Sequence, residues 1–458
     1  MAEPTPITID SPRLLTTRWS PSRCAGDAVH YGARLSGRRR WTGSCWSGTG
    51  TSIAWRQFVG ALRGSLTALL MAVALAATTS CGSDSGAAAA EPPVDLGKLD
   101  VGSFRSAPED YAPPQPVFVA RVFQAERLGD LMPLPSEIDA GLKLNDSTDV
   151  HAFLAPSDGG HNSPMFGWVK PDGFDDLAKG FIAGFATTGE TEEVGYRLSV
   201  SALMFETDVQ ARAAQAALAQ RGPDAGASSF AQARSPSHPD ANAYWIPDVQ
   251  ALVSFYATGK LVLVTTVQDQ ENVTLKVSDQ GLLESLADKA ITVTSEKVKS
   301  FEPTPAAKLA GTPLDPDGLL RISLRRPKGD SFMNMPGVYG AHGYLQLRED
   351  PDKTGRTFER YGVDRVVSDA GLLLRTRDAK SAKEYFDNEL SDKHLVTADS
   401  PPGLPNARCQ KYHGPEYGAI PYYCTVTFGR YVAQMWGEQL PEVHQRISAQ
   451  YAILARNK

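Results

Sequence analysis

VQALVSFYATGKLVLVTTVQDQ, residues 249–270, carries the clearest structural signal in the chain. Two runs rich in β-branched and aromatic residues flank Thr258-Gly259-Lys260, and a short glycine-containing loop between two such runs is typical of a β-hairpin. A second stretch, IPYYCTVTFGRYVAQMWGEQ (420–439), has the same design around Phe428-Gly429-Arg430. The chain therefore contains the same hairpin twice.

Matching segments surround the two hairpins in the same order. In the first half, YRLSVSALMF (196–205) alternates like a strand, and TDVQARAAQAAL (207–218) follows as an alanine-rich helix. In the second half, YGVDRVVSDAGLLLRT (361–376) precedes RDAKSAKEYFDNEL (377–390), and each hairpin leads to a closing helix. We therefore predict an α+β fold made of two tandem copies of an antiparallel sheet with helices packed on one face.

The boundaries of the two copies follow from this repeat. We predict a first α+β domain over residues 97–300 and a second over 301–458, with a proline-containing linker at 301–318. The starts of the halves match only loosely, RVFQAERLGDL (121–131) against GVYGAHGYLQL (337–347). The first copy also carries a loop-like insertion between residues 139 and 176, and loops of that length are often functional or mobile.

An uncharged apolar run at residues 66–79 ends just before Cys81. A membrane-spanning helix needs about 20 apolar residues, so this run is too short to span and has the pattern of a secretory signal peptide. The small residues that precede Cys81 resemble a lipoprotein signal, although Thr78 stands where leucine is usual, and ordinary cleavage near Ser80 is the alternative. We predict a lipoprotein signal peptide at 59–80 and a flexible tether at 81–96.

Lipidation of Cys81 would give the protein a diacylglyceryl anchor, with acyl chains such as palmitate, at the extracytoplasmic face of the cell membrane. Two acyl chains hold durably, because each buried methylene contributes about 0.8 kcal/mol. Residues 1–58 are rich in arginine, contain no lysine and show no apolar periodicity. We therefore predict that they are a spurious or disordered extension, with translation starting near Val59 or Leu62.

The composition is that of an ordinary globular protein, with 42% hydrophobic and 21% charged residues. A net charge of −6 argues against nucleic acid as a partner. With Cys24, Cys45 and the lipid-bearing Cys81 set aside, only Cys409 and Cys424 remain, and a single pair in an exported chain indicates a disulfide.

The repeat places this disulfide between neighbouring strands of the second copy. Aligning the two turn glycines puts Cys424 at the position of Ser254, and matching 243–245 with 407–409 puts Cys409 at the position of Trp245. Closing a loop of about 15 residues contributes about 3 kcal/mol in the chain-entropy model.

Motifs that carry catalysis are missing. The sequence has no G-x-S-x-G elbow, no H-E-x-x-H helix, no phosphate-binding P-loop and no C-x-x-C pair, and we expect no cofactor. In DPDKTGRTFERY (350–361), Asp350, Asp352 and Thr354 have the spacing of a calcium loop, but Tyr361 occupies the place of its bidentate glutamate. A helix capped by Asp350 or Asp352 is the favoured interpretation, and no metal site is predicted.

Aromatic residues gather around the second hairpin. With nearby proline and glycine, they could line a cleft for a sugar or a lipid chain. Cross-strand aromatic pairs that only stabilise the sheet are the alternative, and the favoured one. The candidate ligand-binding residues are Tyr412, Tyr422, Tyr431 and Trp436.

Several motifs resemble a family of uncharacterised cell-envelope lipoproteins from mycobacteria, nocardiae and their relatives. They are PVDLGKLDVGSF (93–104), RLGDLMPLPSEID (127–139), GFIAGF (180–185), HPDANAYW (238–245), and VYGAH with RDAKSAKEYF in the second copy. The resemblance covers nearly all of residues 93–458 and implies no known activity or functional residue. A weaker likeness, at the level of the fold, is to extracellular sensor domains of mycobacterial kinases.

Two classes of function follow. The favoured hypothesis is a non-enzymatic, sensor-like envelope lipoprotein that binds a lipid, glycan or protein partner through a groove between its two copies. The alternative is an envelope hydrolase or transferase that uses Asp158, His161 and Asp172 of the 139–176 insertion. A scaffold without a small ligand is a third possibility.

Overall fold

The computed structural model describes residues 94–457, apart from 112–115, 147–150, 159, 161–162, 166, 225, 227, 327–335, 391 and 416–419. The predicted leader, signal peptide and Cys81 therefore lie outside the described residues. The segment from Val94 onward belongs to one compact unit. Within the described ranges, no helix combines the length and the apolar character needed to cross a membrane.

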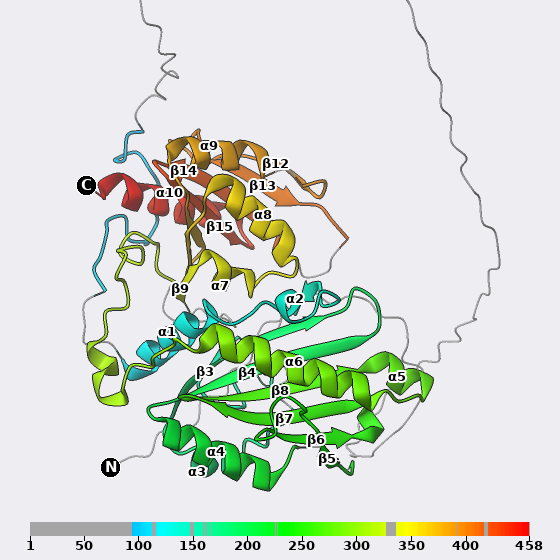
Figure 1. Ribbon diagram of the computed structural model, residues 1–458. Coiled ribbons are helices and arrows are strands. Elements are labelled where there is room, and N and C mark those ends of the chain that lie inside the picture. Colours follow the sequence, from blue (N-terminus) through cyan, green and yellow to red (C-terminus); the bar gives the residue numbers. More distant parts are fainter. Residues whose placement is uncertain are drawn as a thin grey trace, which may run out of the picture. The chain divides into compact units, whose positions relative to one another are not determined.

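The first predicted hairpin lies at the centre of an antiparallel sheet, sheet A (Figure 1). Its strands are β7 (Ala251–Thr258) and β8 (Leu261–Asp269), which pair with Thr258 opposite Leu261. The sheet order is β1-β3-β4-β8-β7-β6-β5, and β2 also pairs with β3. The other strands are β1 (Leu144–Asn145), β2 (Ala152–Phe153), β3 (Phe181–Glu190), β4 (Tyr196–Phe205), β5 (Ala231–Ala233) and β6 (Asn242–Ile246).

The second hairpin lies at the centre of sheet B. Its strands are β14 (Tyr422–Phe428) and β15 (Tyr431–Gly437). The sheet order is β12-β13-β14-β15-β11-β10-β9. The other strands are β9 (Gly337–Gly340), β10 (Arg365–Ser368), β11 (Leu372–Arg375), β12 (Leu395–Ala398) and β13 (Arg408–Tyr412).

The two sheets have the same topology. From the β9 edge, sheet B follows β9-β10-β11-β15-β14-β13-β12, which reproduces the order β1-β3-β4-β8-β7-β6-β5 of sheet A strand by strand. The helix after β4, α4 (Asp208–Arg221), corresponds to α9 (Ala379–Asn388) after β11, and the helices that follow the hairpins, α6 (Gln280–Val298) and α10 (Leu440–Arg456), also correspond. The prediction of a tandem α+β fold with two antiparallel sheets is confirmed.

The helices cover both faces of sheet A, whereas the sequence predicted helices on one face. Along β7, Val253 and Phe255 pack in one core with Ala214 of α4, while Leu252 packs in another core with Leu286 of α6. The reason lies in the central strands, where consecutive positions are apolar. A strand of that kind must be covered on both sides.

The remaining helices are short, apart from α1 and α8. Thr207 caps α4 through a capping box with Gln210, and Asp378 caps α9 by accepting the Ser381 amide at 2.7 Å. The other helical segments are α1 (Val117–Gly129), α2 (Pro135–Ile138), α3 (Phe174–Leu177), η2 (Pro247–Val249), α5 (Gln270–Leu275), η3 (Ala306–Gly311), α7 (Ala341–Leu345) and α8 (Pro351–Tyr361).

The largest hydrophobic core contains residues from both halves. It includes Ala120 of α1 and Leu286 of α6 together with Met435 of β15 and Ile453 of α10. The segment predicted as a linker contributes Leu309, with an exposed fraction of 1%. The two sheets are therefore joined through buried apolar contacts as well as through the chain.

Residues 97–111, assigned to the first copy by sequence, run along elements of the second half. Gln445 of α10 donates to Asp100 at 3.0 Å, and the guanidinium of Arg105 donates to backbone carbonyls of Leu320 and Ser323. Arg325 lies 3.9 Å from the centre of the Tyr111 ring. Figure 1 shows this segment beside α10. We call residues 94–111 the strap.

The register of the sheets corrects one part of the repeat alignment. Cys424 corresponds to Ser254, because each precedes its hairpin turn by the same number of residues. Cys424 pairs with Cys409 across β13, whereas Ser254 pairs with Ala243 across β6. Cys409 therefore corresponds to Ala243, and the match to Trp245 was wrong by two residues. A two-residue shift keeps a side chain on the same face of a strand, which is why the sequence pattern did not expose it.

Candidate functional site

The loosely matching starts of the two halves pack against each other, and we call their contact the seam. It joins α1 and α2 of the first half to β9 and α7 of the second. Glu126 of α1, with an exposed fraction of 1%, accepts a hydrogen bond from the Tyr339 hydroxyl at 3.2 Å. One turn further on, Asp130, the residue that caps the end of α1, accepts the Gly340 amide at 2.8 Å. Two carboxyl groups spaced four residues apart thus lie on one helix face against the same strand.

Burial controls the protonation of both carboxyl groups. It raises the pKa of Glu126 well above the ordinary value, and hydrogen bonds from Tyr339 and the Val338 amide do not reverse this. Burial also raises the pKa of Asp130, against the amide of Gly340 and the charge of Arg365. The Tyr339 pKa is raised well above its usual range, by burial and then by Glu126. These groups prefer their uncharged forms.

Glu137 of α2 behaves in the opposite way. Its carboxylate accepts hydrogen bonds from the Lys297 ammonium at 2.7 Å and the Leu134 amide at 2.7 Å, and lies 3.1 Å from Nε2 of His342. Burial opposes ionisation, but these hydrogen bonds outweigh it and lower the pKa of Glu137 to about 2. Burial therefore favours the uncharged form of the carboxyl group in the interior of the seam, whereas hydrogen bonds favour the ionised form of the one at its edge.

Two amide side chains complete the seam. The buried Gln346 donates from Nε2 to the carbonyls of Met132 at 2.9 Å and Pro133 at 3.1 Å, and its Oε1 accepts from the Thr187 hydroxyl at 2.8 Å. Asn145 of β1 donates to the Leu345 carbonyl at 2.9 Å. Both amide side chains donate to backbone carbonyls of a neighbouring segment. Their role is therefore to position these segments rather than to take part in a reaction.

A groove of about 370 Å³ lies next to the seam, and one of its walls is α7. Its apolar part comes from Ala341, Leu345, Phe358 and Val363, and Gly355 of α8 opens it. His342, Glu359 and Asp364 add polar groups, and Gly362 completes the lining. All lining residues belong to the second half, although the sequence-based hypothesis placed the groove between the copies. The contact of His342 with Glu137 and the hydrogen bond from Asn145 to the Leu345 carbonyl connect it to the first half.

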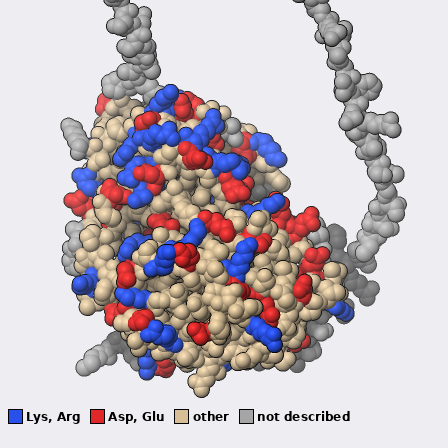
Figure 2. Space-filling model, in the orientation of Figure 1, with Lys and Arg blue, Asp and Glu red and all other residues tan. Residues whose placement is uncertain are grey.

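Charged side chains of both signs are distributed over one face of the molecule. Figure 2 shows Lys and Arg side chains interspersed with Asp and Glu over the face that contains α7 and α8. Asp364 accepts two hydrogen bonds of 2.8 Å from Arg375, so that carboxylate is already paired.

The four predicted aromatic residues do not line one cleft. Directly paired residues share a face, and the register places Tyr422 and Tyr431 on the face of sheet B that carries Cys424 and packs against α10. Tyr412 and Trp436 belong to the alternate positions, on the opposite face. Tyr412 lies 6.0 Å from the His394 ring, and Lys411 lies over Tyr422 at 5.7 Å. The structure thus divides these residues between two faces.

The calcium-loop lookalike is the start of a helix. Asp350 caps α8 by accepting the Lys353 amide at 2.8 Å, and Pro351 opens the helix. Asp352 and Thr354 lie within α8. They are therefore part of a helix and not of a loop that wraps around a calcium ion.

Of the three insertion residues proposed for the enzyme hypothesis, the two that the structure describes, Asp158 and Asp172, have separate partners. Asp158 closes a turn by accepting the amides of Leu154 at 2.6 Å and Ala155 at 2.8 Å. The Asp172 carbonyl accepts a hydrogen bond from Arg221, and His161 lies outside the described residues. Two of the three residues thus have contacts typical of loop stabilisation.

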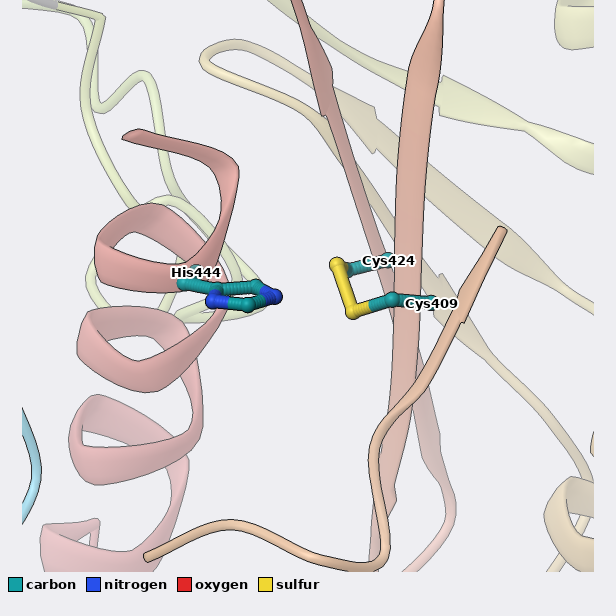
Figure 3. Close-up of side chains that lie close together, drawn as sticks. All are labelled: Cys409, Cys424 and His444. Atoms are coloured by element: carbon teal, nitrogen blue, oxygen red, sulfur yellow. A yellow bond between two sulfur atoms is a disulfide. The ribbon is translucent and has the colours of Figure 1, made fainter. Parts of the chain in front are cut away.

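Cys409 and Cys424 are bonded, with a Cα–Cα distance of 4.1 Å. His444 of α10 points toward this disulfide (Figure 3), and ligand-type atoms of the three residues lie within 4.8 Å of one another. Nε2 of His444 donates to the Asp399 carbonyl at 2.7 Å, since a carbonyl can only accept. While the sulfur atoms are bonded to each other, neither is the thiolate that a metal ion would require.

A hydroxyl, an imidazole and a carboxylate also meet at α6. Asp288 lies 3.2 Å from Nδ1 of His238, whose Nε2 is 3.4 Å from the Thr292 hydroxyl. Thr292 donates to the Asp288 carbonyl at 3.0 Å, so its single proton is not shared with the imidazole. Asp288 also accepts the Ser235 hydroxyl at 2.6 Å. The cluster fastens the 235–238 loop to α6.

Sequence reasoning missed the seam residues Glu126, Asp130 and Tyr339. A signal was present: two acidic residues four apart in the apolar stretch VFVARVFQAERLGD, and glycines three apart in GVYGAHG. Identifying the seam also required knowing that the two stretches pack against each other, which a single sequence does not reveal.

Comparisons with known proteins place the chain in a family but not in a functional class. No curated protein matches it. The solved extracellular domain of PknH from Mycobacterium tuberculosis is similar at 13% identity and a TM-score of 0.23, covering 37% of this chain and 96% of that one. Residues 111–314 match the "Domain of unknown function (DUF7373) N-terminal", and residues 319–457 match its C-terminal counterpart. The chain therefore belongs to the DUF7373 family, an uncharacterised family with two parts.

Proposed function

We propose that the protein is a non-enzymatic binding module, anchored at the outer face of the cell membrane, whose groove receives apolar side chains of a protein partner. The groove is the observation that carries this proposal. Its apolar lining from Leu345, Phe358 and Val363 offers burial, and its polar groups include Glu359, an exposed carboxylate. An open groove of about 370 Å³ suits side chains of a polypeptide better than a long acyl chain, which favours an enclosed tunnel.

The contacts of the candidate catalytic groups support a binding role over an enzymatic one. Asp158 closes a turn, Asp288 fastens a loop and Asp364 is paired with Arg375. The groove itself is lined by no serine, threonine or cysteine. Among the residues named above, none has the combination of nucleophile, base and open substrate space that acyl or glycosyl transfer requires.

Photo-crosslinking tests the groove in the intact protein. A benzophenone amino acid at position 359 should crosslink in cells to a specific protein, and the crosslinked peptide should carry apolar residues. Its synthetic copy should bind the purified protein and lose at least tenfold in affinity with Gly355→Trp, which fills the groove. The control places the probe at Val396, an exposed residue of β12. The proposal fails if both positions capture the same proteins, or if Gly355→Trp binds the peptide as well as the wild type does.

The anchor is a separate part of the proposal and rests on the sequence pattern around Cys81. Metabolic labelling with an alkyne fatty acid should mark the wild type and not Cys81→Ala. Equal labelling of both proteins would exclude Cys81 as the lipidated residue and leave the groove test unaffected.

A further inference from the structure

We propose that the seam regulates the groove: protons held at the seam keep α7 in place as a groove wall, so partner binding is favoured by acid and weakened as the pH rises. The inference deepens the proposed function and rests on it only where binding is concerned. The position of α7 can be tested without a partner.

The first step is that α7 depends on the first half. It is only five residues long, and so short a helix has little stability of its own. At its start, Asp130 holds the Gly340 amide, and Glu137 contacts His342. At its end, Asn145 holds the Leu345 carbonyl. Displacement of α1 from β9 would therefore release a wall of the groove.

The second step is that α1 meets β9 through buried carboxyl groups whose pKa values are raised by burial. Glu126 is buried against Tyr339, and one of its oxygens, Oε2, is buried without a hydrogen-bond partner among the described residues. The titratable and charged groups that face the two carboxyls are Tyr339 from β9, His342 from α7 and Arg365 from β10. His342 and Arg365 act as cations on Asp130. Glu126, in contrast, has the phenol of Tyr339 and the carboxyl group of Asp130 beside it.

The sign of the effect follows from linkage. A carboxyl group with a raised pKa in the folded state stabilises the fold fully below its unfolded pKa, which is about 4.5 for Glu126. That contribution is lost as the pH rises through the folded value, because a buried anion then replaces a neutral acid. The contact of Glu126 with Tyr339 therefore loosens as the pH rises.

Hydrogen exchange on the full chain tests the first part of the inference. Amide protection of a peptide covering 337–346, corrected for the intrinsic pH dependence of exchange, should fall at least tenfold between pH 6 and pH 9. Protection in β7 (251–258), distant from the seam in the fold, serves as the control and should change much less. In Glu126→Gln, whose neutral amide cannot ionise, the decline over 337–346 should be reduced at least threefold.

Three outcomes would overturn the inference: protection over 337–346 that does not depend on pH, a parallel loss in β7, or the same decline in Glu126→Gln. If Glu126→Gln does not fold, Asp130→Asn replaces it with the same criterion. The peptide identified by crosslinking should bind at least threefold more weakly at pH 8.5 than at pH 6. If hydrogen exchange behaves as expected but no peptide binds the groove, the inference about the seam is supported and the proposed function is refuted.

Discussion

Glu126 and Glu137 show how neighbouring carboxyl groups acquire opposite properties. Both come from the short stretch that forms α1 and α2, and both contact the second half. Glu126 has lost water without gaining a cation, whereas Glu137 gains Lys297 and His342 as partners. The sequence shows only two glutamates. Their difference comes from the packing of a distant segment, which explains why it could not be predicted.

Glu137→Gln should lower stability at neutral pH by no more than about 1 kcal/mol, because the side chain is 35% exposed and water screens its ion pairs. The pKa of Glu137 is lowered to about 2, so its contribution is present above its unfolded value near 4.5 and is lost as the pH falls toward 2. Urea unfolding at pH 7 and pH 3.5 checks this. A difference between variant and wild type that grows on acidification would contradict it.

Gly337→Ala should destabilise the protein by about 1–3 kcal/mol, the usual cost of overpacking. A Cβ at this position would overlap the carboxyl group of Glu126, which is buried and has little room to move. The matched control is Gly355→Ala in α8, where the nearest atom is Leu345 Cδ1 at 3.5 Å. That change should stabilise by about 0.5–1 kcal/mol, because alanine favours the helix interior. Thermal unfolding of both variants measures the two changes in stability. The prediction is wrong if the two changes have the same sign.

At the scale of elements, local signals made much of the fold predictable. The glycine turns, the alternation along β4 and the caps at Thr207 and Asp378 all lie within a few residues of the structure they specify. The repeat then predicted two equivalent sheets. What it could not fix was the pairing of β6 with β7, since a shift of two residues preserves the inward face. The helix on the second face of sheet A was missed because continuous apolar strands carry no period that shows how many layers cover them.

The corrected register predicts a new disulfide in sheet A. Ala243→Cys with Ser254→Cys should form a bond, because this pair corresponds to Cys409 and Cys424 and both positions are buried on the face toward α6. It should contribute about 2–3 kcal/mol when oxidised, as expected for a short closed loop. Trp245→Cys with Ser254→Cys, the pair implied by the sequence alignment, is the control and should stay reduced. Non-reducing peptide mapping distinguishes them, and a bond in the control pair would restore the original alignment.

At the scale of the whole molecule, the two halves are interleaved rather than merely consecutive. The strap precedes the first half in sequence, yet Arg105 and Tyr111 bind elements of the second. The segment that was predicted as a linker buries Leu309 and Leu314 in the shared core. A sequence repeat reveals equivalent units, but it does not show how tightly they pack, because contacts between copies leave no periodic pattern.

The interleaving predicts that the halves unfold together. Since one core joins α1 and α6 to β15 and α10, exposing one half removes buried apolar area from the other, and calorimetry should give a single transition with equal calorimetric and van't Hoff enthalpies. Arg105→Ala should shift that whole transition by about 2 kcal/mol, because it removes charge-assisted hydrogen bonds to the carbonyls of residues 320–323. Arg212→Ala, which removes an exposed pair with Asp208 on α4, is the control and should change stability by less than about 0.5 kcal/mol. If the Arg105→Ala trace instead splits into two transitions, with sheet B melting first, the halves are independent folding units and the shared core does not couple them.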